Sequence, residues 1–278
     1  MNLALSRLEG GPPLAAPRSH RHTKARFAEH TDSILAGVDL APASVHEAFD
    51  CLSIVGRRLR DSGDPRAAFT DVYAVITRRV RDSIDGRGPR LFDEPQFISR
   101  LAGRFCRLYL DALRRSLMHD PEPIGAWAVA NGPRGRDRLL PVQHALLGLN
   151  AHINFDLAIG LSSNVRALGG AADPETMARY RHDHDAVNRI LDEAFPEVMD
   201  LLAERYGCRV ARIVVSAGRL PSRAARGVTM RALRAWRARV WLELEELLAA
   251  ASEAEAGRVR ARMDLRASLF ARLFSVAL

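Results

Sequence analysis

Apolar side chains recur every three or four residues along most of the chain, and short polar or Pro- and Gly-containing segments separate these periodic stretches. This spacing places the apolar residues on one face of an α-helix. Helix-start signals agree with it, because Ser44 and Glu47 form a capping box and an Asp precedes Pro65 and Pro174. The pattern predicts about seven helices, over residues 44–59, 65–84, 93–118, 141–161, 173–206, 224–251 and 253–274.

Three segments fall outside this pattern. Residues 1–26 carry Pro, Gly and basic residues without periodicity, which predicts a flexible tail ahead of a single domain over 27–278. Residues 119–138 are rich in Pro and Gly and predict a long loop around Trp127. The run RVARIVVSAGR at 209–219 fits either a short strand or a turn of helix. We therefore expect an all-α fold, a single multi-helix bundle.

The helix predicted over 141–161 differs from the others in composition. Between Leu139 and Val165 the one formally charged residue is Asp156, although 27% of the whole chain is charged. A helix that is apolar nearly all round is buried, so we predict that this helix is the centre of the bundle. A carboxylate buried there is costly unless it is paired, hydrogen-bonded or bound to a cation.

A second helix offers partners for that carboxylate. His152 precedes Asp156 by four residues, so the two lie at the same edge of the central helix, and Asp183 and His184 lie on the core side of the helix over 173–206. Facing helices that each carry a carboxylate and an imidazole are how bundles build metal sites. We predict that a divalent metal, Zn, Mn or Fe, is held by His152, Asp156, Asp183 and His184.

Other polar residues complete this predicted site. Tyr180 is a candidate proton donor, so the predicted catalytic residues are the four ligands and Tyr180. Asp111 is a candidate further ligand or a partner of a ligand. The loop around Trp127 is expected to act as a lid. The candidate substrate-binding residues are Asn150, Asn154, Asn188, Trp127 and His144.

An alternative interpretation needs no metal. Buried His, Asp and Asn side chains can satisfy one another, and an arginine such as Arg104 can neutralise a carboxylate. His152 and Asp156 would then form either a structural network or an acid–base pair whose pKa values burial moves apart.

Charge and cysteine content restrict the class of protein. The net charge is +8, but Lys24 is the single lysine, and the arginines are interleaved with acidic residues. Such a composition is typical of a GC-rich genome, and the spread of charge argues against a nucleic-acid-binding face. The cysteines are few and far apart, which indicates a reducing compartment. No secretory signal, membrane-spanning stretch or phosphate-binding motif occurs, so we expect a cytoplasmic protein without a nucleotide cofactor.

The string GLNAHINFDL over 148–157 resembles the mark of an uncharacterised bacterial family of unknown function, G-M-N-A-H-I-N-x-D-L. FISRLAGRFCRLYLDAL, PVQHALLG and the run from Asp183 to Asn188 also resemble this family, so the resemblance extends over most of the chain from about Ser44. Leu149 departs from the usual Met, and His144 stands where an apolar residue is expected. The resemblance implies no reaction. It does imply that the polar residues of this string form a characteristic group, which consists of Asn150, His152, Asn154 and Asp156.

A weaker similarity is to the zinc-dependent phospholipase C and single-strand nuclease group, all-α enzymes with an H-x3-D on a central helix. The P-x-H element that follows in those enzymes is missing here, so we do not expect a trinuclear zinc site.

These observations lead to two expectations of function. The first is a metal-dependent enzyme, a hydrolase, lyase or cyclase/isomerase, that acts on a small, largely apolar biosynthetic metabolite. The alternative is a metal-free helical cyclase/isomerase or hydrophobic-ligand-binding protein that uses the buried His152–Asp156 pair. The expected partner in both is a small molecule, and the sequence leaves a homodimer open.

Overall fold

The computed structural model describes residues 33–122, 124–132, 138–169, 173–216 and 219–275, and the tail predicted over 1–26 lies outside them. Within these ranges every regular element is a helix, so the predicted all-α class is confirmed. The predicted number is wrong, because the described ranges hold ten α-helices and a π-helical turn. Their bounds are α2 Val45–Asp61, α3 Ala67–Ile84, α4 Pro95–Met118, α5 Gly125–Asn131, α6 Pro141–Ala151, η2 His152–Asp156, α7 Leu157–Leu168, α8 Pro174–Glu204, α9 Arg209–Ser216, α10 Arg219–Ala249 and α11 Glu253–Phe274.

The additional helices arise where sequence signals are weak. The run at 209–219 is helical rather than extended, as α9. The loop predicted over 119–138 contains α5, whose first backbone N–H groups donate to a distant carboxylate: Gly125 N and Ala126 N lie 3.1 and 3.3 Å from Asp264 side-chain oxygens. This cap from α11 provides hydrogen-bond acceptors for N–H groups at the start of α5 that have no partner within the helix. The local sequence contains no sign of that cap.

The central helix predicted over 141–161 is also divided. The chain forms α6, then one π-helical turn over His152–Asp156, and then α7, which continues to Leu168. The Leu157 N–H bonds to the His152 carbonyl, the five-residue spacing of a π-helix. All five residues of the π turn are buried, as the scarcity of charge predicted. The polar side chains of this turn therefore lie inside the molecule.

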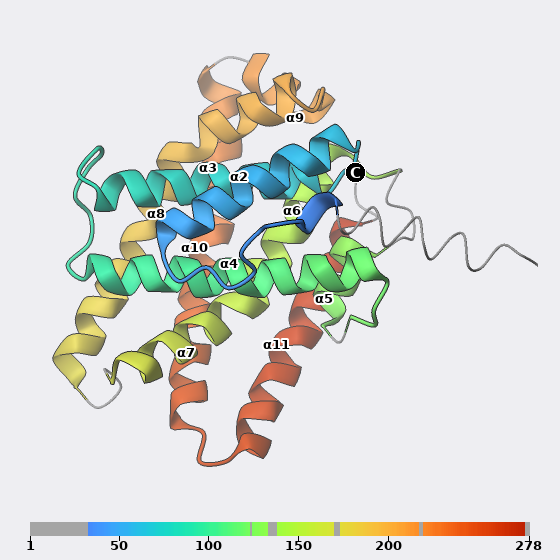
Figure 1. Cartoon of the computed structure of the whole chain (residues 1–278). Coiled ribbons are helices and arrows are strands. Elements are labelled where there is room, and N and C mark those ends of the chain that lie inside the picture. The colour runs from blue at the N-terminus through green and yellow to red at the C-terminus, as the bar shows by residue number, and fades with distance from the viewer. Residues whose placement is uncertain (1–32, 123, 133–137, 170–172, 217–218, 276–278) are drawn as a thin grey trace, which may run out of the picture.

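Figure 1 shows the arrangement of the helices, of which α4, α10 and α11 pack on the π turn. α2, α3 and α4 pack on one another, and α8 crosses α3. α10 and α11 form a hairpin, in which α11 packs on α5, α6 and η2 while α10 packs on α7 and α8. Among the described residues, no helix is both long enough and apolar enough to cross a membrane.

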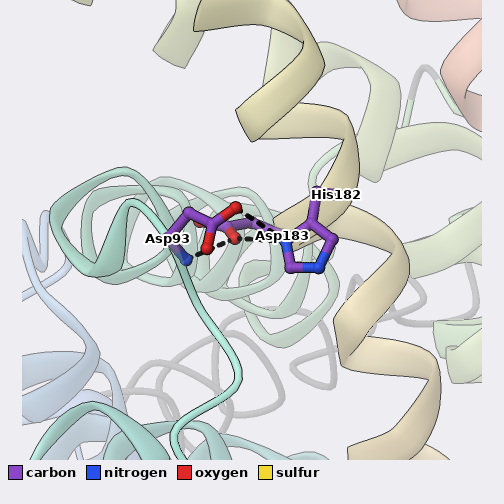
Figure 2. A group of neighbouring side chains, drawn as sticks. All are labelled: Asp93, His182 and Asp183. Carbon is purple, nitrogen blue, oxygen red and sulfur yellow. Dashed lines mark hydrogen bonds and ion pairs between the residues drawn. The ribbon is translucent and has the colours of Figure 1, made fainter.

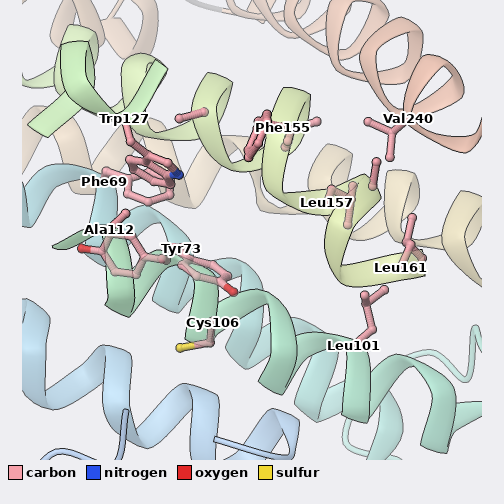
Figure 3. Packing of buried hydrophobic residues seen from close by; sticks show 14 of the residues in the cluster. Phe69, Tyr73, Leu101, Cys106, Ala112, Trp127, Phe155, Leu157, Leu161 and Val240 are labelled. Atoms are coloured by element: carbon pink, nitrogen blue, oxygen red, sulfur yellow. The ribbon is translucent and has the colours of Figure 1, made fainter. Parts of the chain in front are cut away.

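One cluster of buried apolar side chains runs through these helices, from Ile34 to Ala271. Figure 3 shows its aromatic part, in which Phe69 of α3 lies beside Trp127 of α5 and Tyr73 lies one turn further along α3. These rings cover one side of the π turn, so the buried polar groups there face aromatic rather than solvent surroundings.

Candidate functional site

The π turn brings His152 and Asp156 into direct contact, as their spacing predicted. His152 Nδ1 lies 3.1 Å from Asp156 Oδ2, and both side chains are almost fully buried. Trp127 Nε1 donates to the same Asp156 oxygen at 3.0 Å. Two groups from different helices therefore hold the carboxyl, and the carboxyl in turn orients the imidazole through one ring nitrogen.

The second ring nitrogen of His152 is in a different position. Nε2 is buried and has no hydrogen-bond partner among the described residues. The imidazole stacks on Phe105, with ring centroids 3.2 Å apart, and its centroid lies 4.4 Å from that of Tyr73. A buried polar atom without a partner costs free energy, so Nε2 is a candidate for contact with a ligand.

Burial favours the uncharged forms of this pair. It lowers the pKa of His152 well below its ordinary value and raises the pKa of the Asp156 carboxyl well above its ordinary value, although the Trp127 N–H opposes the latter shift. The ordinary pKa of histidine lies above that of aspartate, so these two shifts oppose the ordinary separation of the values and do not widen it as the metal-free interpretation expected. His152 is then a neutral imidazole over a wide pH range, which is the form that accepts a proton or binds a metal.

His152 borders a cavity of about 100 Å³ whose walls come mainly from α3, α4 and α8. Apolar side chains form most of these walls, among them Val80, Leu101, Leu157 and Leu191. Other wall residues, such as Phe105, are only half-buried, so part of the wall lies close to solvent. A concave, mostly apolar space with a few polar groups is the usual form of a small-molecule site.

His184 of α8 and Arg237 of α10 line the same cavity. His184 Nδ1 lies 3.1 Å from Asp185 Oδ1, while its buried Nε2 has no partner within the described part of the chain. Arg237 is 5% exposed, and its terminal nitrogen donates to the His184 carbonyl. Burial lowers the pKa of His184 to about 4 and that of Arg237 to about 10. Two of the four predicted ligands, His152 and His184, thus meet at one cavity.

Asp183 occupies a different place from the one predicted. Its side chain is fully buried, and its two oxygens accept from the backbone N–H groups of Asp93 and Glu94, each at 2.7 Å. These residues immediately precede α4, so Asp183 caps that helix from α8. It does not join His152 and Asp156, because adjacent positions on a helix point about 100° apart and His184 takes the cavity side.

Asp183 has another neighbour that sequence patterns did not indicate. His182 Nδ1 lies 3.1 Å from Asp93 Oδ2 and 3.3 Å from Asp183 Oδ1 (Figure 2). In the described ranges this trio is the one group of three or more His, Cys, Asp or Glu side chains close enough to share an ion. His182 and Asp93 are more than half exposed and Asp183 is occupied by backbone donors, so an ion pair explains the contact.

The remaining predicted residues fall outside the cavity wall. Asn150 donates to the Ala267 carbonyl at 2.8 Å, and Asn154 donates to Asn150 Oδ1 at 2.9 Å, so this pair ties the π-helical segment to α11. Tyr180 stacks on Phe97 with ring centroids 3.9 Å apart. Trp127 is buried in α5 beneath other side chains, so the predicted lid is wrong.

Four further residues named in the sequence analysis also lie outside the cavity wall. Asp111 is half-exposed and pairs with Arg114 and Arg115, so it is not a ligand of this site. Arg104 bonds to Ser163 rather than to a buried carboxylate. His144 lines a separate small space near Gly148, and Asn188 is half-buried on α8.

Sequence reasoning missed Arg237, Phe105 and Tyr73. Arg237 could not be identified from the sequence, because its helix carries many arginines and no local pattern distinguishes the one that is buried. Tyr73 could have been found, since it lies in a run of apolar residues on α3 that contains few charges.

Comparison with known proteins identifies the family but no function. No curated protein and no solved structure matches the chain. A family model described as a family of unknown function, DUF5995, matches residues 45–276. This range includes the cavity, the π turn and the helices that surround them, and it agrees with the resemblance noted in the sequence. The chain therefore belongs to the DUF5995 family of unknown function.

Proposed function

We propose that this protein binds a small, largely apolar organic molecule in the cavity beside His152 and exchanges a proton with it, as a metal-free isomerase, lyase or cyclase. One observation carries the proposal. His152 is fixed through Nδ1 by Asp156, whereas Nε2 has no partner among the described residues and the ring borders an apolar cavity.

The chemistry follows from the state of the pair. Proton transfer to His152 uses Asp156 as a carboxylate, the form that the Trp127 N–H favours. The neutral imidazole donates its Nδ1–H to this carboxylate and accepts a proton at Nε2, and the carboxylate stabilises the resulting imidazolium. The reverse transfer returns a proton from Nε2 to another atom of the ligand. The apolar wall excludes water, which strengthens these interactions. Isomerisation, elimination and cyclisation are the reaction types that need only such proton movements.

Solvent hydrogen exchange tests this function without knowledge of the natural substrate. Small apolar ketones and enones are incubated with the protein in D2O, and deuterium incorporation is followed by mass spectrometry. We expect exchange that falls by about 10² to 10⁴ in His152→Gln, the range typical of a lost general base. The matched control is His144→Gln, which removes another buried histidine outside this cavity.

Two results would contradict the proposal. Exchange that is unchanged in His152→Gln would remove His152 from the chemistry. Exchange that is abolished by a chelator and restored by a divalent ion would show that the reaction depends on a metal.

A metal-dependent enzyme is our second proposal, and one observation favours it. His152 and His184 line the same cavity, and neither Nε2 has a hydrogen-bond partner in the described ranges. Two neutral imidazoles and a substrate oxygen could complete a zinc, manganese or iron site. Elemental analysis of the purified protein tests this proposal, which requires near-stoichiometric metal that is lost in both His152→Ala and His184→Ala.

A further inference from the structure

The cavity has a second polar region, formed by Arg237 and His184. Arg237 is 5% exposed and lies among apolar wall residues from α3, α4 and α8. One of its terminal nitrogens donates to the His184 carbonyl. Its Nε is buried and, among the described side chains and backbone groups, has no hydrogen-bond partner.

Acidic groups near Arg237 do not pair with it. The negative charge of Asp185 acts on Arg237, but Asp185 is 55% exposed and bonds to His184 Nδ1 instead. Within the described residues no carboxylate lies within 4.0 Å of the guanidinium. A buried cation without a counter-charge destabilises a fold, whereas methionine of similar length would pack there at little cost.

We propose that the molecule bound in this cavity carries a carboxylate, which Arg237 binds. This inference rests on the proposed function and names its substrate class, an apolar organic acid. A guanidinium offers donors that match a carboxylate, and Arg237 Nε is an available donor of this kind. His184 lines the same wall, but its neutral ring donates from Nδ1 to Asp185, so its Nε2 is an acceptor and does not bond to the carboxylate.

The arrangement gives each end of the ligand a role. The carboxylate binds at Arg237, which neutralises the buried charge, and the apolar body occupies the space lined by residues such as Leu157 and Leu191. His152 borders this same space, so the carboxylate orients the apolar body relative to the proton-transfer group. Burial lowers the pKa of Arg237 to about 10, and the guanidinium therefore stays charged at neutral pH.

Matched pairs of probes test the proposal on the full chain. Hexanoate, octanoate and 3-phenylpropanoate are compared with 1-hexanol, 1-octanol and 3-phenylpropanol by isothermal titration calorimetry. We expect at least one carboxylate to bind about tenfold or more tightly than its alcohol, as hydrogen bonds to charged groups allow. Arg237→Met should lose this preference and keep the affinity for the alcohol. Arg181→Met, which removes an exposed arginine near Trp241, should keep the preference.

A second readout does not need the variant to fold. The Arg237 Nε–H resonance of the wild-type protein should shift on addition of the carboxylate and not on addition of the alcohol. Alcohols that bind as tightly as carboxylates, with no Nε–H shift, would overturn this inference and leave the apolar site of the proposed function standing. Failure of every probe of both classes to bind would overturn this inference and the proposed site together.

Discussion

At the scale of single residues, burial of uncharged histidine dominates the chemistry of this protein. His152 and His184 are almost completely buried, and burial lowers the pKa of both. In His184 the desolvation effect is reinforced by the nearby charge of Arg237 and opposed by Asp185. Each histidine therefore enters the folded state as a base rather than as a cation.

This burial predicts acid sensitivity. The pKa of His184 falls from 6.5 to about 4 on folding, so the unfolded state binds the extra proton between these values. The free energy of unfolding therefore has its full value above pH 6.5 and decreases as the pH falls toward 4. The decrease due to His184 is up to about 3 kcal/mol, at 1.36 kcal/mol per pKa unit. His184→Gln should therefore show a smaller loss of unfolding free energy between pH 7 and pH 4.5 in urea titrations.

His46→Gln is the matched control, because the His46 side chain is 54% exposed. It removes a histidine that does not line the cavity, so the comparison isolates the effect of burial at His184. A His184→Gln variant whose stability falls with pH as steeply as the wild type would contradict the buried neutral imidazole.

At the scale of helices, side chains from distant segments cap the starts of two helices. α4 begins at Pro95, and the carboxylate that caps it comes from Asp183 of α8. α5 begins with a cap from Asp264 of α11. The capped N–H groups lie at the helix starts, just before α4 and in the first residues of α5, so each cap also joins two helices.

The cap on α4 predicts a structural role for Asp183. Asp183→Asn keeps one acceptor oxygen and loses the charge, so it should reduce the free energy of unfolding by about 1–3 kcal/mol. Asp200→Asn changes an exposed carboxylate on the same helix and should have an effect within about 0.5 kcal/mol. Denaturant titration of both variants makes the comparison, and equal stabilities would argue against the cap.

Close packing of α6 on α3 predicts that alanine in place of Gly148 lowers the stability of the protein. A Cβ on Gly148 would lie 2.6 Å from Phe69 Cδ1, whereas a Cβ on Gly227 in α10 would meet nothing within 4 Å. Alanine is favoured over glycine in a helix by about 1 kcal/mol. Gly227→Ala should therefore stabilise the protein, and Gly148→Ala should destabilise it by about 1–3 kcal/mol through overpacking.

Thermal unfolding distinguishes these two variants. Because Phe69 lines the cavity and its ring lies beside His152, Gly148→Ala should also weaken binding of apolar probes. A stabilised Gly148→Ala protein would show that Phe69 can move away without cost.

At the scale of the whole molecule, the C-terminal hairpin completes the fold around the π turn. α11 packs on α5, α6 and η2, and the Asn150 amide bonds to the Ala267 carbonyl. α10 supplies Arg237 to the cavity. The segments that build the site therefore extend from α3 to α10, and α11 supports them from outside.

This arrangement predicts unequal roles for neighbouring residues of α11. Met263 is 0% exposed, and Leu265 is 63% exposed. Met263→Ala should reduce the free energy of unfolding by about 2–5 kcal/mol, since it leaves a cavity in the core. Leu265→Ala should change it by less than about 0.5 kcal/mol. Similar values for the two variants, measured by denaturant titration, would contradict the packing of this helix.

The sequence by itself determined the features that depend on local spacing. Apolar periodicity and capping residues predicted the all-α class and most helix positions, since both act within a few residues. The near absence of charge around Asp156 predicted a buried segment, and the four-residue spacing predicted its contact with His152.

The tertiary structure alone decided which groups from distant segments meet these residues. A helical pattern gives the direction of a side chain around its own axis, but it does not specify the element that lies in that direction. Asp183 points inward as expected and meets the backbone before α4, while Asp156 meets Trp127 from a segment predicted as a loop. Arg237 reaches the cavity because α10 packs on α7 and α8, a long-range contact that no local pattern encodes.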